Sequence, residues 1–500
     1  MGWEQIYEQW KNHQQLEAGL KDQLTELEKD PEMLQDAFYM PLEFGTAGMR
    51  GILGPGINRM NIYTVRQATE GLARFMDTQD PETRRRGVAI AYDSRHFSPE
   101  FAMEAAKTLA KHDIPAFVFE SLRPTPELSF AVRYLHTFTG IMITASHNPA
   151  AYNGYKVYGE DGGQMPPADA DALTAFVREI ENPLEIPVLS EEEAKHSGLI
   201  TIIGEEVDTA YLKEVKTVTI DQKLIETTGK NLKLVYTPLH GTGRMLGEKA
   251  LKQAGFEQFI IEPSQAVADP NFSTVKSPNP EEHSAFEYAI ALGEKEDADL
   301  LIATDPDADR LGAAVRMPDG NYQVLTGNQI GAIMIRYILE AHKQAGTLPS
   351  NAVVLKSIVS SELATTIADA YNVKMVDVLT GFKFIAEKIQ QYEDDNSQTF
   401  MFGFEESYGY LIKSFVRDKD AIQAFVLLAE VAAFYKQSDK TLYDGLQDIF
   451  EEYGYYAEKT ISVTMSGMEG AAKITALMKT FREKAPSVFA GIPVVQTEDF

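Results

Sequence analysis

Cysteine is absent from the 500-residue sequence. Disulfide bonds, thiolate metal sites and cysteine nucleophiles are therefore excluded. A chain without cysteine fits a reducing compartment, and we expect this protein to be cytoplasmic. The N-terminus also lacks a basic segment followed by an apolar one, and Gly2 lacks the Ser or Thr that a myristoylation signal requires four residues later. We therefore expect neither a secretory signal nor a lipid anchor.

Long apolar runs are missing as well. The most apolar stretch, residues 421–434, contains Gln423 and Glu430, so we expect no contact with a membrane. Basic residues are few: 46 Lys and Arg stand against 74 Asp and Glu, which gives a formal net charge of −28 at pH 7. This balance argues against nucleic acid as a partner, because a nucleic-acid binder needs a basic face. An anionic substrate has to be attracted by a local cluster of Arg and Lys.

The composition, 44% hydrophobic and 24% charged residues, is that of an ordinary globular protein, and the chain is long enough for several cores. Strand and helix patterns alternate along most of the chain, which predicts an α/β fold class with three successive α/β domains on mixed sheets. The last segment has α+β character, with a helix, a strand at Thr460–Met465 and another helix. We place the four domains at residues 1–204, 205–325, 326–440 and 441–500.

The first 38 residues show a helical pattern with aromatic side chains on one face: Trp3, Tyr7 and Trp10, together with Ile6. Two interpretations are open. The segment either packs on the first domain or forms an arm that binds a partner, and we favour packing.

One stretch, T-G-I-M-I-T-A-S-H-N-P from Thr139, carries the strongest chemical signal. Its apolar run predicts a buried strand, and the Asn-Pro turn places Ser146 on a loop at the carboxyl end of that strand, where open α/β sheets bind ligands. A second short strand carries Lys156, so a hairpin can bring its ammonium group back toward Ser146. A hydroxyl beside the imidazole of His147, with a cation nearby, suits phosphoryl or acyl transfer. Acyl transfer is disfavoured because the G-x-S-x-G elbow is absent, and a plain surface loop stays open as an alternative.

A glycine-rich loop, F-G-T-A-G-M-R-G-I-L-G-P-G from Phe44, contains Arg50. Loops with many glycines let backbone N–H groups approach an anion. A second glycine motif, His240 to Gly243, is a near miss of the dinucleotide fingerprint, since its third glycine comes one residue late. We interpret this second motif as a tight turn between a strand and a helix.

Three carboxylates follow another apolar strand in the run D-P-D-A-D-R: Asp305, Asp307 and Asp309. In an extended segment such alternate residues project to one side, so the carboxylates converge and a divalent cation is needed to offset their repulsion. An EF-hand is excluded, because its sixth and twelfth positions are Arg310 and Arg316. Mg²⁺ that completes its shell with a phosphate oxygen fits best, and a solvated acidic turn is the alternative.

The loop G-F-E-E-S-Y-G from Gly403 also follows an apolar strand. Its acids and hydroxyl suit a polyol, because carboxylates accept hydrogen bonds from sugar hydroxyls. The segments Thr380-Gly381-Phe382-Lys383 and Arg417 to Asp420 add cations to the same unit. Taken alone, each segment is better explained as ordinary surface charge than as a site.

Together these motifs resemble the α-D-phosphohexomutase family. T-A-S-H-N-P, D-P-D-A-D-R and F-E-E-S-Y-G stand in this order on three successive α/β units, and T-A-G-M-R-G, Y-N-G-Y-K and T-G-F-K match as well. The resemblance covers roughly residues 40–440 and is closest to the phosphoglucomutase/phosphomannomutase members.

The resemblance implies a role for each motif. Ser146 is expected to carry a phosphoryl group, and Asp305, Asp307 and Asp309 are expected to bind Mg²⁺ together with the phosphate on Ser146. The cationic and acid-base residues around them are Arg50, His147, Lys156 and Arg310. The substrate-binding residues are Glu405, Ser407, Thr380, Gly381, Lys383 and Arg417. The first three domains then become the phosphoserine, metal-binding and sugar-binding domains.

The implied activity is interconversion of α-D-glucose 1-phosphate and glucose 6-phosphate through a phosphoserine enzyme, with hexose 1,6-bisphosphate as activator. Either His147 or Lys156 exchanges the hydroxyl proton. We expect sugar phosphates as the small-molecule partners and a monomer or homodimer as the assembly. A mutase for mannose, pentose or glucosamine phosphates and a catalytically weak sugar-phosphate binding form stay open, and a dinucleotide enzyme is a remote alternative.

One departure from the family pattern concerns the far phosphate of the substrate. The family's fourth domain supplies a loop rich in Arg, Ser and Thr that grips this phosphate, and nothing after residue 440 resembles it. The resemblance therefore predicts that residues 441–500 form an incomplete C-terminal phosphate-binding domain.

Overall fold

The computed structural model describes residues 2–44, 48–458, 463, 465, 467–497 and 499. The chain divides into two compact units, Met1–Gly454 and Tyr455–Phe500. The first unit contains three of the sheets and all of the predicted site residues.

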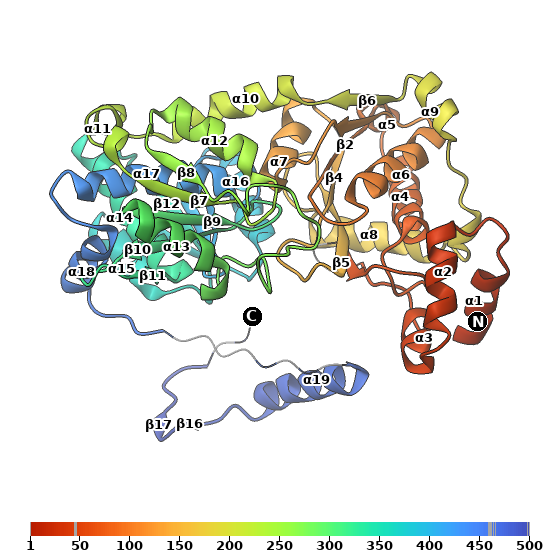
Figure 1. The fold of residues 1–500 in the computed structure, drawn as a ribbon. Coiled ribbons are helices and arrows are strands. Elements are labelled where there is room, and N and C mark those ends of the chain that lie inside the picture. The colour runs from red at the N-terminus through yellow and green to blue at the C-terminus, as the bar shows by residue number, and fades with distance from the viewer. Residues whose placement is uncertain are drawn as a thin grey trace. The chain divides into compact units, whose positions relative to one another are not determined.

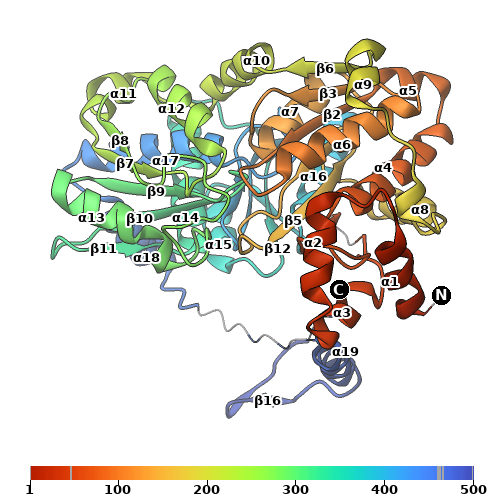
Figure 2. The same cartoon turned by 45° about the vertical axis from the view of Figure 1, so that its right-hand side comes forward.

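Three short helices open the chain: α1 (Trp3–Asn12), α2 (Ala18–Leu27) and α3 (Pro31–Phe38). Their apolar faces enclose a core around Trp10 and Phe38, and this core includes Tyr63 and Leu184 from the domain that follows. The ring of Trp10 makes an edge contact with Tyr63 at 5.4 Å between centroids. The prediction that this segment packs on the first domain is confirmed, and Figures 1 and 2 show the three helices gathered at one end of the first unit.

The first sheet has six strands in the order β1-β5-β4-β2-β3-β6. The strands are β1 (Met49–Ile52), β2 (Val88–Tyr92), β3 (Ala116–Phe119), β4 (Thr139–Ile143), β5 (Tyr152–Tyr158) and β6 (Ile200–Ile203). The strand β2 runs parallel to β3 and β4, whereas β5 runs antiparallel to both β4 and β1. The helices are α4 (Ile62–Asp77), α5 (Pro81–Arg86), α6 (Ser98–Lys111), α7 (Thr125–Tyr134), α8 (Pro167–Arg178) and α9 (Glu191–Ser197).

Side chains alternate along β4, so the two faces of the strand pack against different layers of helices. Ile141 and Ile143 belong to the core that α4, α6 and α8 share. Gly140 faces the opposite side, where Leu128 and Val132 of α7 lie against it. Successive side chains of a strand point to opposite faces, so α7 covers the face that α4 and α6 leave open (Figure 1).

The second sheet has five strands in the order β11-β10-β9-β7-β8. They are β7 (Leu234–Thr237), β8 (Phe259–Ile261), β9 (Leu300–Thr304), β10 (Leu311–Arg316) and β11 (Tyr322–Val324). The helices of this part are α10 (Glu205–Val215), α11 (Gln222–Thr227), α12 (Gly243–Ala254) and α13 (Glu287–Glu296). Short 3-10 helices lie at Pro183–Glu185, Lys216–Val218, Gly229–Asn231 and His283–Phe286. The β9–β10 hairpin is antiparallel, and its connection is the segment from Asp305 to Arg310.

The third sheet has four strands in the order β13-β12-β14-β15. They are β12 (Ala352–Ser357), β13 (Lys374–Val378), β14 (Thr399–Glu405) and β15 (Gly409–Leu411). The helices are α14 (Gly327–Gln344), α15 (Glu362–Ala370), α16 (Phe382–Asp395), α17 (Ala421–Lys436) and α18 (Leu442–Tyr453). All three sheets combine parallel and antiparallel pairs, so the predicted α/β class with mixed sheets is confirmed.

The helix α17 is buried almost along its whole length. Its charged core residue, Glu430, accepts hydrogen bonds from the backbone N–H groups of Ile220 and Asp221 and from the hydroxyl of Tyr337 at 2.7 Å. Buried charge is tolerated when donors satisfy it in this way. No helix in the described part of the chain is long and apolar enough to span a membrane.

The second unit, Tyr455–Phe500, contains α19 (Gly467–Glu483) and a small hairpin of β16 (Val488–Phe489) and β17 (Ile492–Pro493). The strand predicted at Thr460–Met465 falls mostly outside the described residues. The division of the chain into four domains stays a prediction.

Candidate functional site

The serine loop begins where β4 ends. Ser146 is buried, and its backbone is in the left-handed region with φ at 51°, a conformation that residues other than glycine rarely adopt. Its N–H donates a 2.8 Å hydrogen bond to the hydroxyl of Thr144. A strained backbone held by local bonds is typical of functional loops.

A buried arginine holds this loop in shape. The guanidinium group of Arg95 is fully buried and pairs with Asp93 at 3.2 Å. It donates hydrogen bonds to four backbone carbonyl oxygens of the serine loop: Ser146, Asn148, Pro149 and Tyr152. The same group lies over the ring of Phe272 in the second sheet's domain, 4.9 Å from the centroid. Arg95 therefore fixes the position of Ser146 through its main chain.

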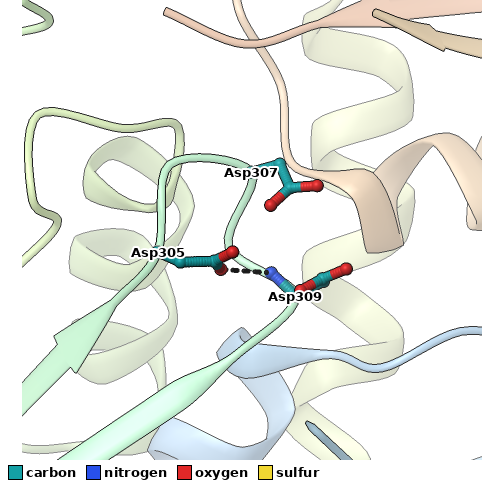
Figure 3. A group of neighbouring side chains, drawn as sticks. All are labelled: Asp305, Asp307 and Asp309. Atoms are coloured by element: carbon teal, nitrogen blue, oxygen red, sulfur yellow. Dashed lines mark hydrogen bonds between the residues drawn. The ribbon is translucent and has the colours of Figure 1, made fainter. Parts of the chain in front are cut away.

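The β9–β10 connection supplies the three carboxylates, and their ligand atoms lie within 4.8 Å of one another. Figure 3 shows them around a common space. The segment is a turn, with φ at 51° for Ala308, and not the extended chain assumed from the sequence. Convergence comes from this turn, which closes because Asp305 Oδ1 accepts the N–H groups of Asp309 and Arg310 at 3.1 and 3.0 Å.

The second glycine motif, His240 to Gly243, packs against this turn. Gly241 lies directly against the backbone of Pro306, with no room for a Cβ atom, and the N–H of Thr242 donates to the Pro306 carbonyl at 2.8 Å. The motif is therefore a tight strand-to-helix turn, as we interpreted it, and its glycine permits close backbone approach.

The serine and the carboxylates come together across two sheets. Ser146 Oγ donates a 2.7 Å hydrogen bond to Asp305 Oδ2. His147 Nδ1 lies 3.2 Å from the same Oγ atom. Lys156, aligned with Met142 by the β4–β5 pairing, places its ammonium group 2.9 Å from Asp307 Oδ2.

In both Asp307 and Asp309, one carboxylate oxygen pairs with a lysine and the other accepts no hydrogen bond from a described residue, although Arg310 Nε lies 3.9 Å from Asp309 Oδ1. Asp307 Oδ2 faces Lys156, and Asp309 Oδ2 faces Lys419 at 3.1 Å. The Oδ1 atoms of both carboxylates are buried without a hydrogen-bond partner among the described residues. An orphaned carboxylate oxygen is costly unless a cation binds it, so this donor set fits a hard divalent metal ion.

Burial and mutual repulsion control ionisation here. Burial, together with the neighbouring carboxylates, raises the pKa of Asp305 and Asp309. Burial acts to raise the pKa of Asp307, but the charge of Lys156 together with hydrogen bonds to Asp305, Lys156 and Thr125 outweighs burial, and the pKa is lowered. Burial and the nearby Arg310 and Arg50 lower the pKa of His147 to about 3, so its imidazole is neutral at pH 7.

The predicted sugar-binding loop lies next to this turn. Arg310 forms a β-bridge with Gly409, and the N–H of Leu311 donates to the carbonyl of Tyr408 at 3.0 Å. Glu405 is buried and accepts the N–H of Gly381 at 2.9 Å, and burial raises its pKa. This hydrogen bond holds the segment after β13 against the last residue of β14.

The remaining predicted residues divide into two groups. Arg50, which is exposed, donates to Asn148 Oδ1 at 3.0 Å and so lies at the serine loop. Ser407 is half-buried between Glu406 and Tyr408, and Thr380 is exposed. Residues 45–47 of the glycine-rich loop lie outside the described part of the chain.

Two predicted residues have neighbours away from the carboxylates. Lys383 lines a cavity of about 440 Å³ together with Asp161 and Gln164. The guanidinium group of Arg417 is fully buried and binds Glu393 and the carbonyl of Ser414. The structure therefore does not bring Arg417 together with the serine and the aspartates.

Sequence reasoning missed three residues of the site: Arg95, Thr125 and Lys419. Of the three, only Lys419 lies within a segment that the sequence analysis named, Arg417 to Asp420. Lys419 lies two residues after Arg417, and Arg95 follows the strand β2. Their partners are distant in sequence, so only the fold reveals their roles.

Comparisons with known proteins agree with this geometry. Three family models match in succession: the phosphoglucomutase/phosphomannomutase alpha/beta/alpha domains I at residues 41–184, II at 209–318 and III at 326–453. The chain therefore belongs to the phosphoglucomutase/phosphomannomutase family, and the resemblance predicted from its motifs is confirmed.

Named relatives support the assignment. A phosphoglucomutase of Staphylococcus epidermidis is 43% identical over 470 residues, which cover 94% of this chain and 83% of the relative. One of Staphylococcus aureus is 42% identical over 467 residues, covering 93% and 82%. Among solved structures, a phosphoglucomutase/phosphomannomutase family protein of Burkholderia thailandensis shares the fold with a TM-score of 0.61 at 18% identity, covering 80% of this chain and 78% of that one. The open form of Paramecium parafusin gives 0.64 at 17%, covering 83% and 76%.

We predict that Arg95→Lys lowers kcat of phosphoryl transfer about 10²-fold. A lysine keeps the charge but cannot donate to four carbonyls, so the serine hydroxyl shifts, and a misplacement of about 1 Å has this effect. Steady-state kinetics measure it, with Arg86→Lys as the control, because the partly exposed Arg86 at the end of α5 also donates to backbone carbonyls, those of His136 and Thr137. Unchanged kcat in a folded Arg95→Lys protein contradicts the prediction.

Proposed function

We propose that this chain interconverts α-D-glucose 1-phosphate and α-D-glucose 6-phosphate as an intramolecular phosphotransferase. The observation that carries the proposal is the hydrogen bond from Ser146 Oγ to Asp305 Oδ2, which joins a nucleophilic hydroxyl to a buried group of three carboxylates. Membership of a family whose named relatives are phosphoglucomutases supports the reaction type.

The reaction proceeds through phosphoserine. The bond between phosphorus and Ser146 Oγ breaks while a new bond forms to the free sugar hydroxyl, which gives up its proton and yields a hexose bisphosphate. After the bisphosphate turns end over end, Ser146 Oγ attacks the other phosphoryl group and the product monophosphate leaves. Free hexose 1,6-bisphosphate restores a lost phosphoserine by the same second step, which makes it an activator.

Proton transfer falls to His147 or Lys156. A neutral His147, with Nδ1 at 3.2 Å from Ser146 Oγ, can accept a proton from a hydroxyl. The ammonium group of Lys156, held by Asp307, can stabilise charge on the transferred group. Arg310 and Arg50 lie close enough to His147 to lower its pKa, so they add positive charge in the same space.

Asp305, Asp307 and Asp309 would hold the metal ion, with the phosphate on Ser146 completing its shell. Three carboxylates and a phosphate are hard oxygen donors, and Mg²⁺ is the ion such a set prefers. When bound, Mg²⁺ supplies electrostatic stabilisation of the phosphoryl group. The buried, unpartnered Oδ1 atoms of Asp307 and Asp309 support this assignment.

The sugar hydroxyls are bound by Glu405 and Ser407, with Thr380, Gly381 and Lys383 nearby. The carboxylate of Glu405 is anchored by Gly381, which suits recognition of a fixed sugar orientation.

Mutases for mannose, pentose or glucosamine phosphates would share the serine and aspartate site. A coupled assay across glucose, mannose, ribose and glucosamine 1-phosphates tests specificity, and we expect the highest kcat/KM for glucose. A clear preference for another sugar overturns the assignment of substrate but not of reaction.

We predict that Ser146→Ala abolishes both turnover and the phosphorylated form of the protein, because alanine has no hydroxyl group to accept the phosphoryl group. Intact mass spectrometry of freshly purified protein measures the form, and a coupled glucose 6-phosphate dehydrogenase assay measures turnover. Ser438→Ala, at an exposed position, serves as the control. Mutase activity near that of the wild type in Ser146→Ala rules the mechanism out.

We predict that chelation of divalent metal stops turnover and that Mg²⁺ restores it. Asp307→Asn should reduce activity at least ~10²-fold while the melting temperature measured in EDTA falls little, since it removes one ligand charge at nearly constant volume. Asp319→Asn, in an exposed turn, is the matched control. If the variant with Asn at positions 305, 307 and 309 retains activity, the three aspartates form only an acidic turn and no metal site.

A further inference from the structure

Thr125 lies at the point where the serine-bearing domain meets the turn with three carboxylates. It is the first residue of α7, its side chain is fully buried, and Pro124 and Pro126 flank it. Proline fixes its own φ and suits the first turn of a helix, so the two prolines restrict the backbone around Thr125. The start of α7 is thus a rigid element directed at another domain.

Thr125 makes two hydrogen bonds to a single residue of that turn. Its hydroxyl donates to Asp307 Oδ2 at 2.9 Å, and its N–H donates to the Asp307 carbonyl, also at 2.9 Å. The first N–H groups of a helix have no partner within the helix, so this N–H is available to another segment. One threonine therefore holds both the main chain and the side chain of Asp307.

These contacts determine which oxygen of Asp307 is left open. Oδ2 receives the hydroxyl of Thr125 and the ammonium group of Lys156, whereas Oδ1 is buried without a partner among the described residues. A carboxylate fixed through one oxygen cannot rotate freely about its terminal torsion. Oδ1 is then the oxygen left for a cation, on a carboxylate whose ligand atom lies within 4.8 Å of those of Asp305 and Asp309 (Figure 3).

The helix start is itself anchored, so it can act as a fixed support. Arg123 binds Asp208 of α10 through two hydrogen bonds, Nε to Oδ1 at 2.8 Å and Nη2 to Oδ2 at 3.1 Å. The N–H of Arg123 donates to the carbonyl of Tyr92 at the end of β2. Paired bonds of this kind between guanidinium and carboxylate impose a definite geometry.

We propose that Thr125 is a positioning residue for the metal site, which orients Asp307 so that its Oδ1 atom is preorganised to bind the divalent cation. This inference rests on the proposed metal site. Groups that bond to a metal ligand typically contribute 10- to 100-fold in metal affinity. A role confined to starting α7 would instead affect stability and leave metal affinity unchanged.

The test compares metal affinity in Thr125→Val, which removes the hydroxyl at similar shape, and in Thr125→Ser, which keeps it. Mn²⁺ binding is measured by titration calorimetry and by EPR of free Mn²⁺, on full-length proteins of equal phosphorylation state. We expect the Kd of Thr125→Val to rise about tenfold or more and that of Thr125→Ser to stay within about threefold of the wild type. Thr108→Val is the control, because the Thr108 hydroxyl is also buried but bonds only within α6.

The outcomes separate this inference from the proposed site. If the wild type binds no Mn²⁺ that competes with Mg²⁺, the proposed metal site fails. If the wild type binds Mn²⁺ and Thr125→Val binds it equally well, the positioning role of Thr125 is wrong. If Thr125→Val does not fold, Thr125→Ala replaces it under the same criteria.

Discussion

Three carboxylates buried within a few ångströms of one another are the constraint on which the rest of the structure depends. Their mutual repulsion opposes folding unless cations and hydrogen-bond donors are brought to them. The fold supplies these donors from separate elements: Ser146 after β4, Lys156 on β5 and Lys419 before α17. The catalytic geometry and the contacts between domains are therefore parts of the same electrostatic arrangement.

The segment from Arg417 to Asp420 shows how closely the domains are linked. The Arg417 N–H donates to Ser129 on α7, and Asp418 accepts the hydroxyl of Tyr158 at 2.7 Å. Lys419 reaches Asp309 in the second sheet's hairpin. Asp420 caps α17. These four consecutive residues therefore contact the serine-bearing domain, the turn with three carboxylates and the start of α17. The cluster of charges seen in the sequence lies at a junction between domains.

Much of the fold could be predicted from local pattern. The strand before Ser146, the hairpin that returns Lys156 and the tight turn at Gly241 follow from apolar runs and turn residues, which are local properties. The convergence of the aspartates was predicted for the wrong local reason, because the chain forms a turn closed by Asp305 and not an extended segment. Here the short motif predicted which residues come together, but it did not predict the backbone conformation that brings them together.

Contacts between distant segments could not be predicted in this way. Thr125 and Asp307 are separated by 182 positions, and Arg95 and Ser146 by 51. A single sequence contains no signal for such pairs, since either residue alone resembles an ordinary strand end or helix start. The partner of Arg417 was equally hidden, because its guanidinium group is bound by Glu393, 24 positions away. The role of Arg417 in substrate binding stays a prediction.

The strongly acidic composition is reconciled with an anionic substrate by the local balance of charge. Formally, the three carboxylates Asp305, Asp307 and Asp309 stand against three cations, Lys156, Arg310 and Lys419. Arg310 also pairs with Glu281 and Lys419 with Asp418, so the group keeps an excess of negative charge. A divalent cation bound to these carboxylates would offset two of the negative charges, in a setting where burial limits screening. The bound metal ion would therefore attract a sugar phosphate against the overall charge of −28, in addition to stabilising its transferred phosphoryl group.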